Sequence, residues 1–439
     1  MNRLDVLLVN APSPNIGMLY AFDKQGAPPL GLGYLGTYLR QKSYSVKILD
    51  MFIPNKTVDS LIDILKENII NIVGFSCTTE TFNMAIKLAK IVKEMNSNTV
   101  VVFGGPHVSF EYHTALSNDA IDYIVINEGE VSLKELCDYC IRGTRELSDL
   151  KGVAYKCDGN IICAEPQRFI HDLDVLPIPD RSLFDDIYQY STPATIITSR
   201  GCPGKCIFCA SSVLSGGRYR MRSAQNVVLE FEYLKSLGFT RISILDDTMT
   251  ASKTRLESIC YELIKRKLEV EWFCESRVDT IDKEMLTLMK AAGLVSIQFG
   301  VESGSQNMLN GIRKDITIDQ IHNAFKICKD VGVKAFTNMI VGLPNADCQA
   351  IEDSIKLAEE IVAIGGTVSW SVCTPFPGTP IWQNPEMFNI EICDKDLEHY
   401  DMCRPVLHTK YMTSSEIRNA FYNAKKSIDG MMAKMSSKT

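Results

Sequence analysis

Residues 199–209 read Ser199-Arg200-Gly201-Cys202-Pro203-Gly204-Lys205-Cys206-Ile207-Phe208-Cys209 and follow an apolar run at 194–199. Three cysteines lie within these eleven residues, and the glycine and proline between the first two allow the chain to curl around a bound group. A structural zinc site needs four protein ligands, but the next cysteine is Cys260 and no histidine intervenes. Three thiolates instead suit a four-iron cluster with one iron left open. We expect Cys202, Cys206 and Cys209 to bind a [4Fe-4S] cluster; zinc and incidental thiols are the alternatives.

The cysteines follow the first of six apolar runs that alternate with helical patterns in the second half of the chain. The runs that predict strands are 194–199, 241–246, 269–275, 295–301, 333–341 and 367–374. Six strand–helix units over roughly 180 residues predict a partial (β/α)6 TIM-like barrel. Its active site would lie at the carboxyl ends of the strands, directly beside the cysteines.

An earlier alternating series occupies residues 1–145. Its near-continuous Val/Ile/Leu runs lie at 4–9, 44–49, 71–76, 99–103 and 121–126, and the clearest helical pattern between them is 81–95. Such runs are typical of parallel strands that are buried on both faces. The fold class is therefore α/β, with a doubly wound (flavodoxin/Rossmann-like) domain before the barrel. Ligands of such sheets bind at the strands' carboxyl ends, although glycines there could serve turns alone.

The boundaries expected from these patterns give four segments. They are a doubly wound domain at 1–150, a hairpin and linker at 151–190, the partial barrel at 191–385 and a short helical extension at 386–439. Asp158-Gly159 is a strong hairpin turn signal between two short strands, and prolines mark the linker after it. The last segment has no clear strand pattern, and one helix is expected near 414–428.

Composition restricts the function classes. The 439 residues have a net charge of −7 and no long basic block, which argues against nucleic-acid binding through a cationic face. The sequence has no apolar run near the roughly 18 residues that a membrane span needs, and the first residues are typical of a strand rather than a signal peptide. Fifteen cysteines, an odd number, favour a reduced, cytoplasmic protein over a disulfide-bonded one.

The cysteine spacing resembles the C-x3-C-x-aromatic-C hallmark of the radical S-adenosylmethionine superfamily, with Phe208 in the aromatic position that lies against the adenine. This resemblance implies that the open iron chelates S-adenosylmethionine and that one electron from the cluster cleaves it to methionine and a 5′-deoxyadenosyl radical. An electron donor such as flavodoxin or ferredoxin is an implied partner.

Further contacts to S-adenosylmethionine are implied by the same resemblance at later strand ends. Asp246 and Asp247 stand where the superfamily commonly has Gly-Gly-Glu, and this departure leaves their roles open. Arg277 would meet the methionine carboxylate, and Glu302 and Ser303 resemble cofactor-contacting positions. Val341 and Gly342 resemble the adenine-binding stretch. Each polar residue, taken alone, could instead form its hydrogen bonds to neighbouring protein groups.

The first domain resembles the cobalamin-binding domain fused to one large radical S-adenosylmethionine group. The resemblance places the cobalamin contacts at Asn10, Pro12, Pro29, Gly31, Ser76, Thr78, Thr79, Gly104, Gly105, His107, Glu128, Gly129 and Glu130. Asn127 replaces a glycine that is often found directly before the stretch Glu128-Gly129-Glu130. The cobalt-ligating motif D-x-H-x-x-G occurs nowhere, so cobalamin is expected base-off, without a protein histidine. His107 would bond to the corrin or its tail, or be a plain loop histidine.

The resemblance implies a cobalamin-dependent radical methyltransferase that methylates an unactivated carbon or phosphinate phosphorus of a small-molecule or natural-product substrate. A cyclase, ring-contraction or rearrangement enzyme with the same cofactors is the alternative, and a non-catalytic cobalamin or redox sensor is a remote one. A tRNA methylthiotransferase is disfavoured because only Cys77 precedes Cys137, whereas that group carries extra amino-terminal cluster cysteines. An auxiliary cluster at Cys373, Cys393 and Cys403 is disfavoured because no paired C-x2-C spacing occurs there.

Overall fold

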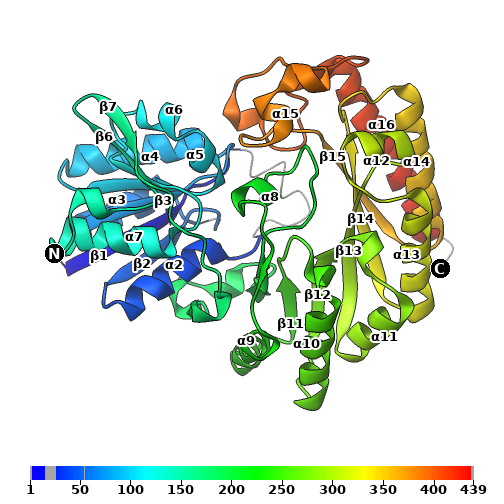
Figure 1. Cartoon of the computed structure of the whole chain (residues 1–439), viewed down its shortest axis with the longest axis horizontal. Helices are drawn as coiled ribbons and strands as arrows, with labels where there is room; N and C mark the ends of the chain where they lie inside the picture. Colours follow the sequence, from blue (N-terminus) through cyan, green and yellow to red (C-terminus); the bar gives the residue numbers. More distant parts are fainter. Residues whose placement is uncertain (1, 15–25, 54, 437–439) are drawn as a thin grey trace. The chain divides into compact units, whose positions relative to one another are not determined.

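The computed structural model describes residues 2–14, 26–53 and 55–436 and divides the chain into two compact units (Figure 1). The first unit comprises the residues up to 193 together with 396–401, and the second comprises 194–395 and the residues from 402 on. Each unit is built around its own sheet of mainly parallel strands.

The sheet of the first unit has the strand order β2-β1-β3-β4-β5-β6-β7. Its first five strands are parallel, and the order 2-1-3-4-5 is that of a flavodoxin-like doubly wound fold. The strands are β1 (Asn2–Asn10), β2 (Val46–Asp50), β3 (Asn68–Ser76), β4 (Val100–Gly104), β5 (Tyr123–Val125), β6 (Val153–Cys157) and β7 (Asn160–Cys163). The helices are α2 (Leu30–Gln41), α3 (Val58–Glu67), α4 (Phe82–Met95), α5 (Pro106–Phe110), α6 (Tyr112–Leu116) and α7 (Gly129–Cys137). The predicted doubly wound domain is confirmed.

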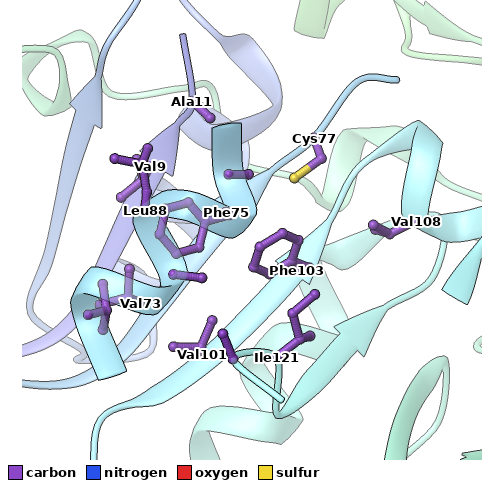
Figure 2. Close-up of a cluster of buried hydrophobic side chains, with 14 of the residues drawn as sticks. Val9, Ala11, Val73, Phe75, Cys77, Leu88, Val101, Phe103, Val108 and Ile121 are labelled. Carbon is purple, nitrogen blue, oxygen red and sulfur yellow. The ribbon is translucent and has the colours of Figure 1, made fainter. Parts of the chain in front are cut away.

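The core of this unit follows from the apolar runs of its central strands. Phe75 on β3 and Phe103 on β4 are neighbours in register, with ring centroids 5.2 Å apart. Helix α4 adds Phe82, whose ring meets Phe103 edge-on at 6.2 Å, and Leu88 (Figure 2). The apolar positions of α4 recur at helical spacing, and this recurrence buries one face of the helix on the sheet.

The hairpin predicted around Asp158-Gly159 forms, and it extends the first sheet rather than standing apart from it. Strand β6 pairs antiparallel with β5, and β7 pairs with β6. The proline-containing segment that follows also packs against the first unit, since Leu176, Phe184 and Tyr190 are buried. Strand β6 begins with three consecutive buried residues, Val153, Ala154 and Tyr155, and its pairing covers the edge of β5 that would otherwise be open.

The second unit has a six-stranded sheet in the order β15-β14-β13-β12-β11-β8, and every pair is parallel. The strands are β8 (Thr195–Ile196), β11 (Arg241–Ile244), β12 (Glu271–Ser276), β13 (Leu294–Glu302), β14 (Lys334–Val341) and β15 (Thr367–Val372). The helices between them are α8 (Ser211–Leu214), α9 (Ala224–Ser236), α10 (Lys253–Lys265), α11 (Lys283–Ala291), α12 (Gln306–Gly311), α13 (Ile318–Val331) and α14 (Cys348–Ala363). Helices α10, α11, α13 and α14 follow one face of the curved sheet in Figure 1. The predicted partial barrel is confirmed.

Strand β12 shows how the two faces of this sheet differ. Trp272 and Cys274 are buried, and the Trp272 indole donates to the carbonyl of Ala292 at the end of α11. Phe273 and Glu275 alternate with them and are only half-buried. Because side chains alternate between the faces of a strand, the first pair faces the helices and the second faces the barrel interior.

The carboxyl-terminal segment contains two short strands that the sequence did not predict. Strands β16 (Ile390–Ile392) and β17 (Leu407–Thr409) form an antiparallel pair. A pair β9 (Ser199–Arg200) and β10 (Arg220–Met221) and the short α15 (Pro380–Gln383) complete the unit before α16 (Ser414–Ser436), which is longer than the expected 414–428. None of the helices in the described ranges combines the length and the apolar character needed to cross a bilayer.

Candidate functional site

The cysteine loop lies at the carboxyl end of β8 and is fixed at its middle. The Ile207 side chain is fully buried, its N–H donates to the Ile312 carbonyl at 3.2 Å, and its own carbonyl accepts from Ile381 N–H at 3.3 Å. Cys206 and Cys209 lie on either side of this anchor and are half-buried. The aromatic Phe208 is half-buried as well.

Gly204 forms a cradle between the sulfur atoms. A Cβ placed on it would lie 3.3 Å from Cys202 Sγ, 3.9 Å from Cys206 Sγ and 3.6 Å from Arg277 Nη1. Its N–H also donates to Cys202 Sγ at 3.4 Å. Two thiols and a guanidinium thus surround one side-chain-free position.

The donor set of the loop fits an iron–sulfur cluster, since cysteine thiolates are the ligands that such clusters take. Among the described residues, no group of three or more His, Cys, Asp or Glu side chains is arranged to hold a metal ion directly. A four-iron cluster is wider than a single ion, so thiolates that bind its separate irons lie farther apart than the ligands of one zinc.

Burial and nearby charges act in opposite directions on the thiols. Burial raises the pKa of Cys206 to about 11, while the positive charges of Lys314 and Arg277 oppose the rise. Burial also raises the pKa of Cys209, against hydrogen bonds from Ser211. The cationic neighbours would favour thiolates and the negative charge of a bound cluster.

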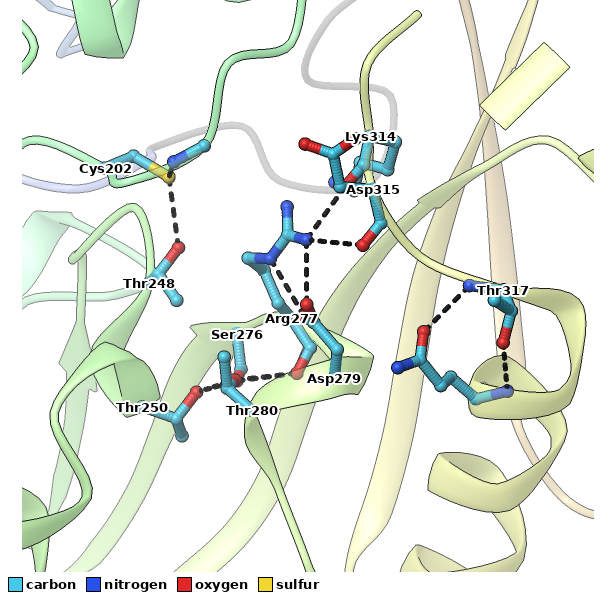
Figure 3. Close-up of polar contacts among 12 residues, drawn as sticks. Cys202, Thr248, Thr250, Ser276, Arg277, Asp279, Thr280, Lys314, Asp315 and Thr317 are labelled. Atoms are coloured by element: carbon cyan, nitrogen blue, oxygen red, sulfur yellow. Dashed lines mark hydrogen bonds and ion pairs between the residues drawn. The ribbon is translucent and has the colours of Figure 1, made fainter. Parts of the chain in front are cut away.

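Arg277 directly follows β12, at the strand end expected from the sequence, and several contacts hold it (Figure 3). Its Nε and Nη2 form a two-point ion pair with Asp279 at 2.9 and 3.0 Å, and Nη2 also donates to the carbonyl of Lys314 at 2.8 Å. Nη1 has no hydrogen-bond partner within the described residues and is the atom next to Gly204. A guanidinium held in this way can still donate from Nη1 to a carboxylate.

Glu302 is paired within the protein. It ends β13 with a positive φ of 71°, and its Oε1 accepts from Lys314 Nζ at 2.7 Å, with both residues buried. A Cβ on Gly300 would lie 2.5 Å from both of these atoms, so a larger residue there would force the pair to shift. Glu302 therefore lies at the expected strand end, and in this structure its carboxylate forms an ion pair with Lys314.

The two adjacent carboxylates after β11 have different surroundings. Asp246 is buried and accepts from the N–H and hydroxyl groups of Thr198 and Ser199 at 2.5 to 3.0 Å. Asp247 is exposed, but neighbouring protein atoms partly desolvate its carboxylate. This desolvation and the negative charge of Asp246 raise the pKa of Asp247. Asp246 thus holds the start of the cysteine loop, whereas Asp247 is accessible to a ligand.

The remaining residues expected at S-adenosylmethionine are mostly internal. Ser303 is buried, its hydroxyl lies 3.1 Å from that of Ser354, and it accepts from Ser305 N–H. Val341 is buried, and its carbonyl accepts from Cys373 N–H at 2.8 Å. Gly342 has a φ of 79°, and a Cβ there would meet Ile417 of α16 at 2.9 Å. These contacts favour positioning roles; direct contact with a nucleotide stays a prediction.

In the first unit, the register brings three expected residues together at the carboxyl edge of the sheet. Asn10 of β1 is the partner of Ser76 on β3, and Ser76 is the partner of Gly104 on β4. Asn10 also donates to the Asp50 carboxylate at 2.8 Å. Gly105 allows a close approach of two chains, because a Cβ on it would lie 2.7 Å from the carbonyl oxygen of Cys77.

Three other residues expected at cobalamin lie inside the protein. His107 is buried, its Nδ1 is 3.3 Å from the Thr79 hydroxyl, and its ring packs on Phe82 with centroids 4.5 Å apart. Burial lowers the pKa of His107 to about 4. Thr79 and Glu130 are buried too. His107 therefore has internal contacts, and a bond from it to the corrin or its tail stays a prediction.

The other expected positions are accessible to different degrees. Thr78 and Gly31 are exposed, and Pro12, Pro29, Glu128 and Gly129 are half-buried. Pro29 begins α2 and Glu128 begins α7, and Glu128 accepts from Ile170 N–H at 3.0 Å.

Two residues near the cysteines were missed by the sequence analysis. Lys314 comes from the loop after α12, and Thr248 places its hydroxyl 3.4 Å from Cys202 Sγ (Figure 3). Thr248 follows Asp247 directly, so its strand-end position was a usable signal. No comparable signal in the sequence pointed to Lys314, because it lies twelve residues beyond its partner Glu302.

Comparisons with known proteins agree with this geometry. Residues 23–137 match the B12 binding domain family and residues 196–358 match the Radical SAM superfamily. A protein of Pyrococcus horikoshii named as an uncharacterized methyltransferase is 34% identical over 395 residues, which cover 89% of this chain and 85% of that protein. The chain is a radical S-adenosylmethionine enzyme with a B12-binding domain. S-adenosylmethionine, an iron–sulfur cluster and cobalamin are the cofactors of this family.

Three further proteins are similar to this radical S-adenosylmethionine enzyme. The anaerobic magnesium-protoporphyrin IX monomethyl ester cyclase of Rubrivivax gelatinosus is 31% identical, over 89% of this chain and 71% of that protein. The methyltransferase TsrM of Kitasatospora setae, solved with cobalamin and a [4Fe-4S] cluster, shares the fold. Its TM-score is 0.76 at 17% identity, covering 98% of this chain and 89% of TsrM. The cobalamin-dependent S-adenosylmethionine radical enzyme OxsB has a TM-score of 0.78 at 18% identity, and the match covers 97% of this chain and 66% of OxsB.

Proposed function

We propose that this enzyme is a cobalamin-dependent radical methyltransferase that acts on a small-molecule substrate. The observation that carries the proposal is the joint presence of two sites: the three-cysteine loop at the mouth of the barrel and the open carboxyl edge of a doubly wound B12-binding sheet. When bound, the cluster supplies the electron that cleaves S-adenosylmethionine, and cobalamin supplies the methyl group that the substrate receives.

The residues of the chain would hold and orient these groups. Cys202, Cys206 and Cys209 would ligate the cluster, and the free Nη1 edge of Arg277 would bind the methionine carboxylate beside it. Asp247 is the accessible carboxylate for the methionine amino group. The buried bonds of Asp246 would keep the loop in place.

Cobalamin would bind base-off along the first sheet, without a histidine ligand from this chain. His107 follows the end of β4 by three residues, and it is buried against Phe82 and Thr79. The accessible positions Ser76, Thr78 and Gly104 would instead line the cofactor. A low-potential donor such as flavodoxin or ferredoxin would reduce the cluster.

The test is anaerobic reconstitution of the full chain with iron, sulfide and hydroxocobalamin, followed by assays of candidate substrates. We expect roughly four irons and one base-off cobalamin per chain, and one S-adenosylhomocysteine with one 5′-deoxyadenosine for each methylated product. Methylated product without 5′-deoxyadenosine would contradict radical chemistry.

A cyclase or rearrangement activity is the second candidate, because the relative from Rubrivivax gelatinosus bears a cyclase name at 31% identity. The same assay separates the two functions. A cyclase would release 5′-deoxyadenosine with product and no S-adenosylhomocysteine.

A further inference from the structure

Two polar side chains in the second unit have no hydrogen-bond or ion-pair partner within the part of the chain that the structure describes. They are Glu275 on β12 and Gln298 on β13, and both are half-buried. The two residues are direct partners in the strand register. Because neighbouring parallel strands lie about 4.8 Å apart, their side chains stand next to each other.

Both side chains face the barrel interior. On β12, Trp272 and Cys274 are buried on the helix side of the strand. Glu275 alternates with them and shares its face with Arg277, whose free Nη1 lies beside Gly204 of the cysteine loop. Glu275 is therefore one side-chain step deeper in the barrel than the cluster loop.

The electrostatic surroundings leave the Glu275 carboxylate without compensation. Burial raises its pKa, and the negative charges of Asp247 and Glu302 raise it further. The nearby cations are already paired, Arg277 with Asp279 and Lys314 with Glu302. A half-buried carboxylate without a partner lowers the stability of the folded chain, as is common at binding sites.

Two aromatic rings border the polar pair. Phe336 on β14 is the register partner of Gln298, and Phe273 precedes Glu275 on the same face of β12. Both rings are half-buried. Carboxylate and amide oxygens accept hydrogen bonds, and the faces of aromatic rings attract cations.

We propose that Glu275 and Gln298 form a binding position for an ammonium group of a ligand inside the barrel. The inference rests on the proposed function only in taking the barrel as the place where ligands bind. The ammonium belongs either to an amine-bearing substrate or to S-adenosylmethionine, for which Glu275 would be a second carboxylate beside Asp247, and the two sources are separated by experiment.

The test compares the reconstituted full chain with Glu275→Gln, Gln298→Leu and the control Glu271→Gln. Glu271 lies on the same strand but is exposed and pairs with Arg241. The probes are S-adenosylmethionine, measured by equilibrium dialysis, and n-butylammonium against n-butanol at equal concentration, measured by thermal unfolding. Iron content and circular dichroism verify that each variant folds.

We expect n-butylammonium to raise the unfolding temperature of the parent protein more than n-butanol does. Glu275→Gln and Gln298→Leu would lose this difference, and Glu271→Gln would keep it. A tenfold loss of S-adenosylmethionine affinity in Glu275→Gln, with the affinity of Glu271→Gln unchanged, would assign the ammonium to that cofactor. The proposal fails if neither probe distinguishes the variants.

The ligand-free protein supplies an independent readout. Removal of an uncompensated charge should raise the unfolding temperature of Glu275→Gln above that of the parent. A lower temperature would mean that Glu275 has a structural partner and would overturn the proposal. Neither measurement involves methyl transfer, so failure here is separable from failure of the proposed function.

Discussion

Replacement of Gly105 by alanine should selectively destabilise the first unit. Gly105 has φ 98° and ψ 179°, a conformation that is nearly restricted to glycine and costs other residues about 1–3 kcal/mol. The new Cβ would also lie 2.7 Å from the Cys77 carbonyl oxygen and 2.9 Å from its nitrogen. Overpacking against backbone costs a further ~1–3 kcal/mol. We therefore expect a loss of about 2–6 kcal/mol in total.

Gly143→Ala is the matched control, because Gly143 also has a positive φ of 63° but no atom lies within 4 Å of its added Cβ. Its cost should be only the backbone term of about 1–2 kcal/mol. The assay is amide hydrogen exchange in peptides of β3 and β4, where 1.4 kcal/mol corresponds to roughly a tenfold faster rate. Equal exchange rates in the two variants would refute the reasoning from the Cys77 contact.

Three further predictions concern other residues. Cys206→Ser should lose most of the roughly four irons bound after reconstitution, and an iron assay that finds the parent content would contradict a ligand role. Glu230→Gln removes the charged partner that lies 2.5 Å from the buried Arg222 and should cost about 3–5 kcal/mol in urea unfolding. Glu232→Gln, which removes the half-buried partner of Arg266, should cost under ~1 kcal/mol. The pKa of His107 is about 4 in the folded chain against 6.5 ordinarily. Because the unfolded chain takes up this proton more readily, the free energy of unfolding is highest above pH 6.5 and falls by about 3 kcal/mol as the pH drops toward 4. His107→Gln should flatten this part of the stability–pH curve, and an unchanged curve would exclude His107 as its source.

The sequence predicted the fold and the residues at the strand ends, because both depend on the periodicity of apolar residues along the chain. Asn10, Ser76 and Gly104 were expected to contact one cofactor at the carboxyl ends of the strands, and the register places them side by side. It was not informative about which polar groups satisfy one another. The pairing of Lys314 with Glu302 depends on a loop that returns to the strand end, and no local pattern encodes such a return.

The same limit applies to burial. His107 follows a Gly-Gly-Pro turn that is typical of an accessible loop, yet α5 begins there and turns the ring toward Phe82. Strands β16 and β17 have three residues each, too few for an alternating pattern to stand out.

The discontinuity of the first unit has a consequence for biosynthesis. Leu397 packs against the core of that unit and the buried Tyr400 belongs to the same unit, but 202 residues of the second unit, 194–395, are translated in between. At about 5–20 residues per second, a ribosome needs roughly 10–40 s to cross that interval. During this time the nascent first unit lacks two of its own apolar side chains. Chaperones would therefore meet it in an incomplete form, and expression of residues 1–193 alone would preserve that immature state.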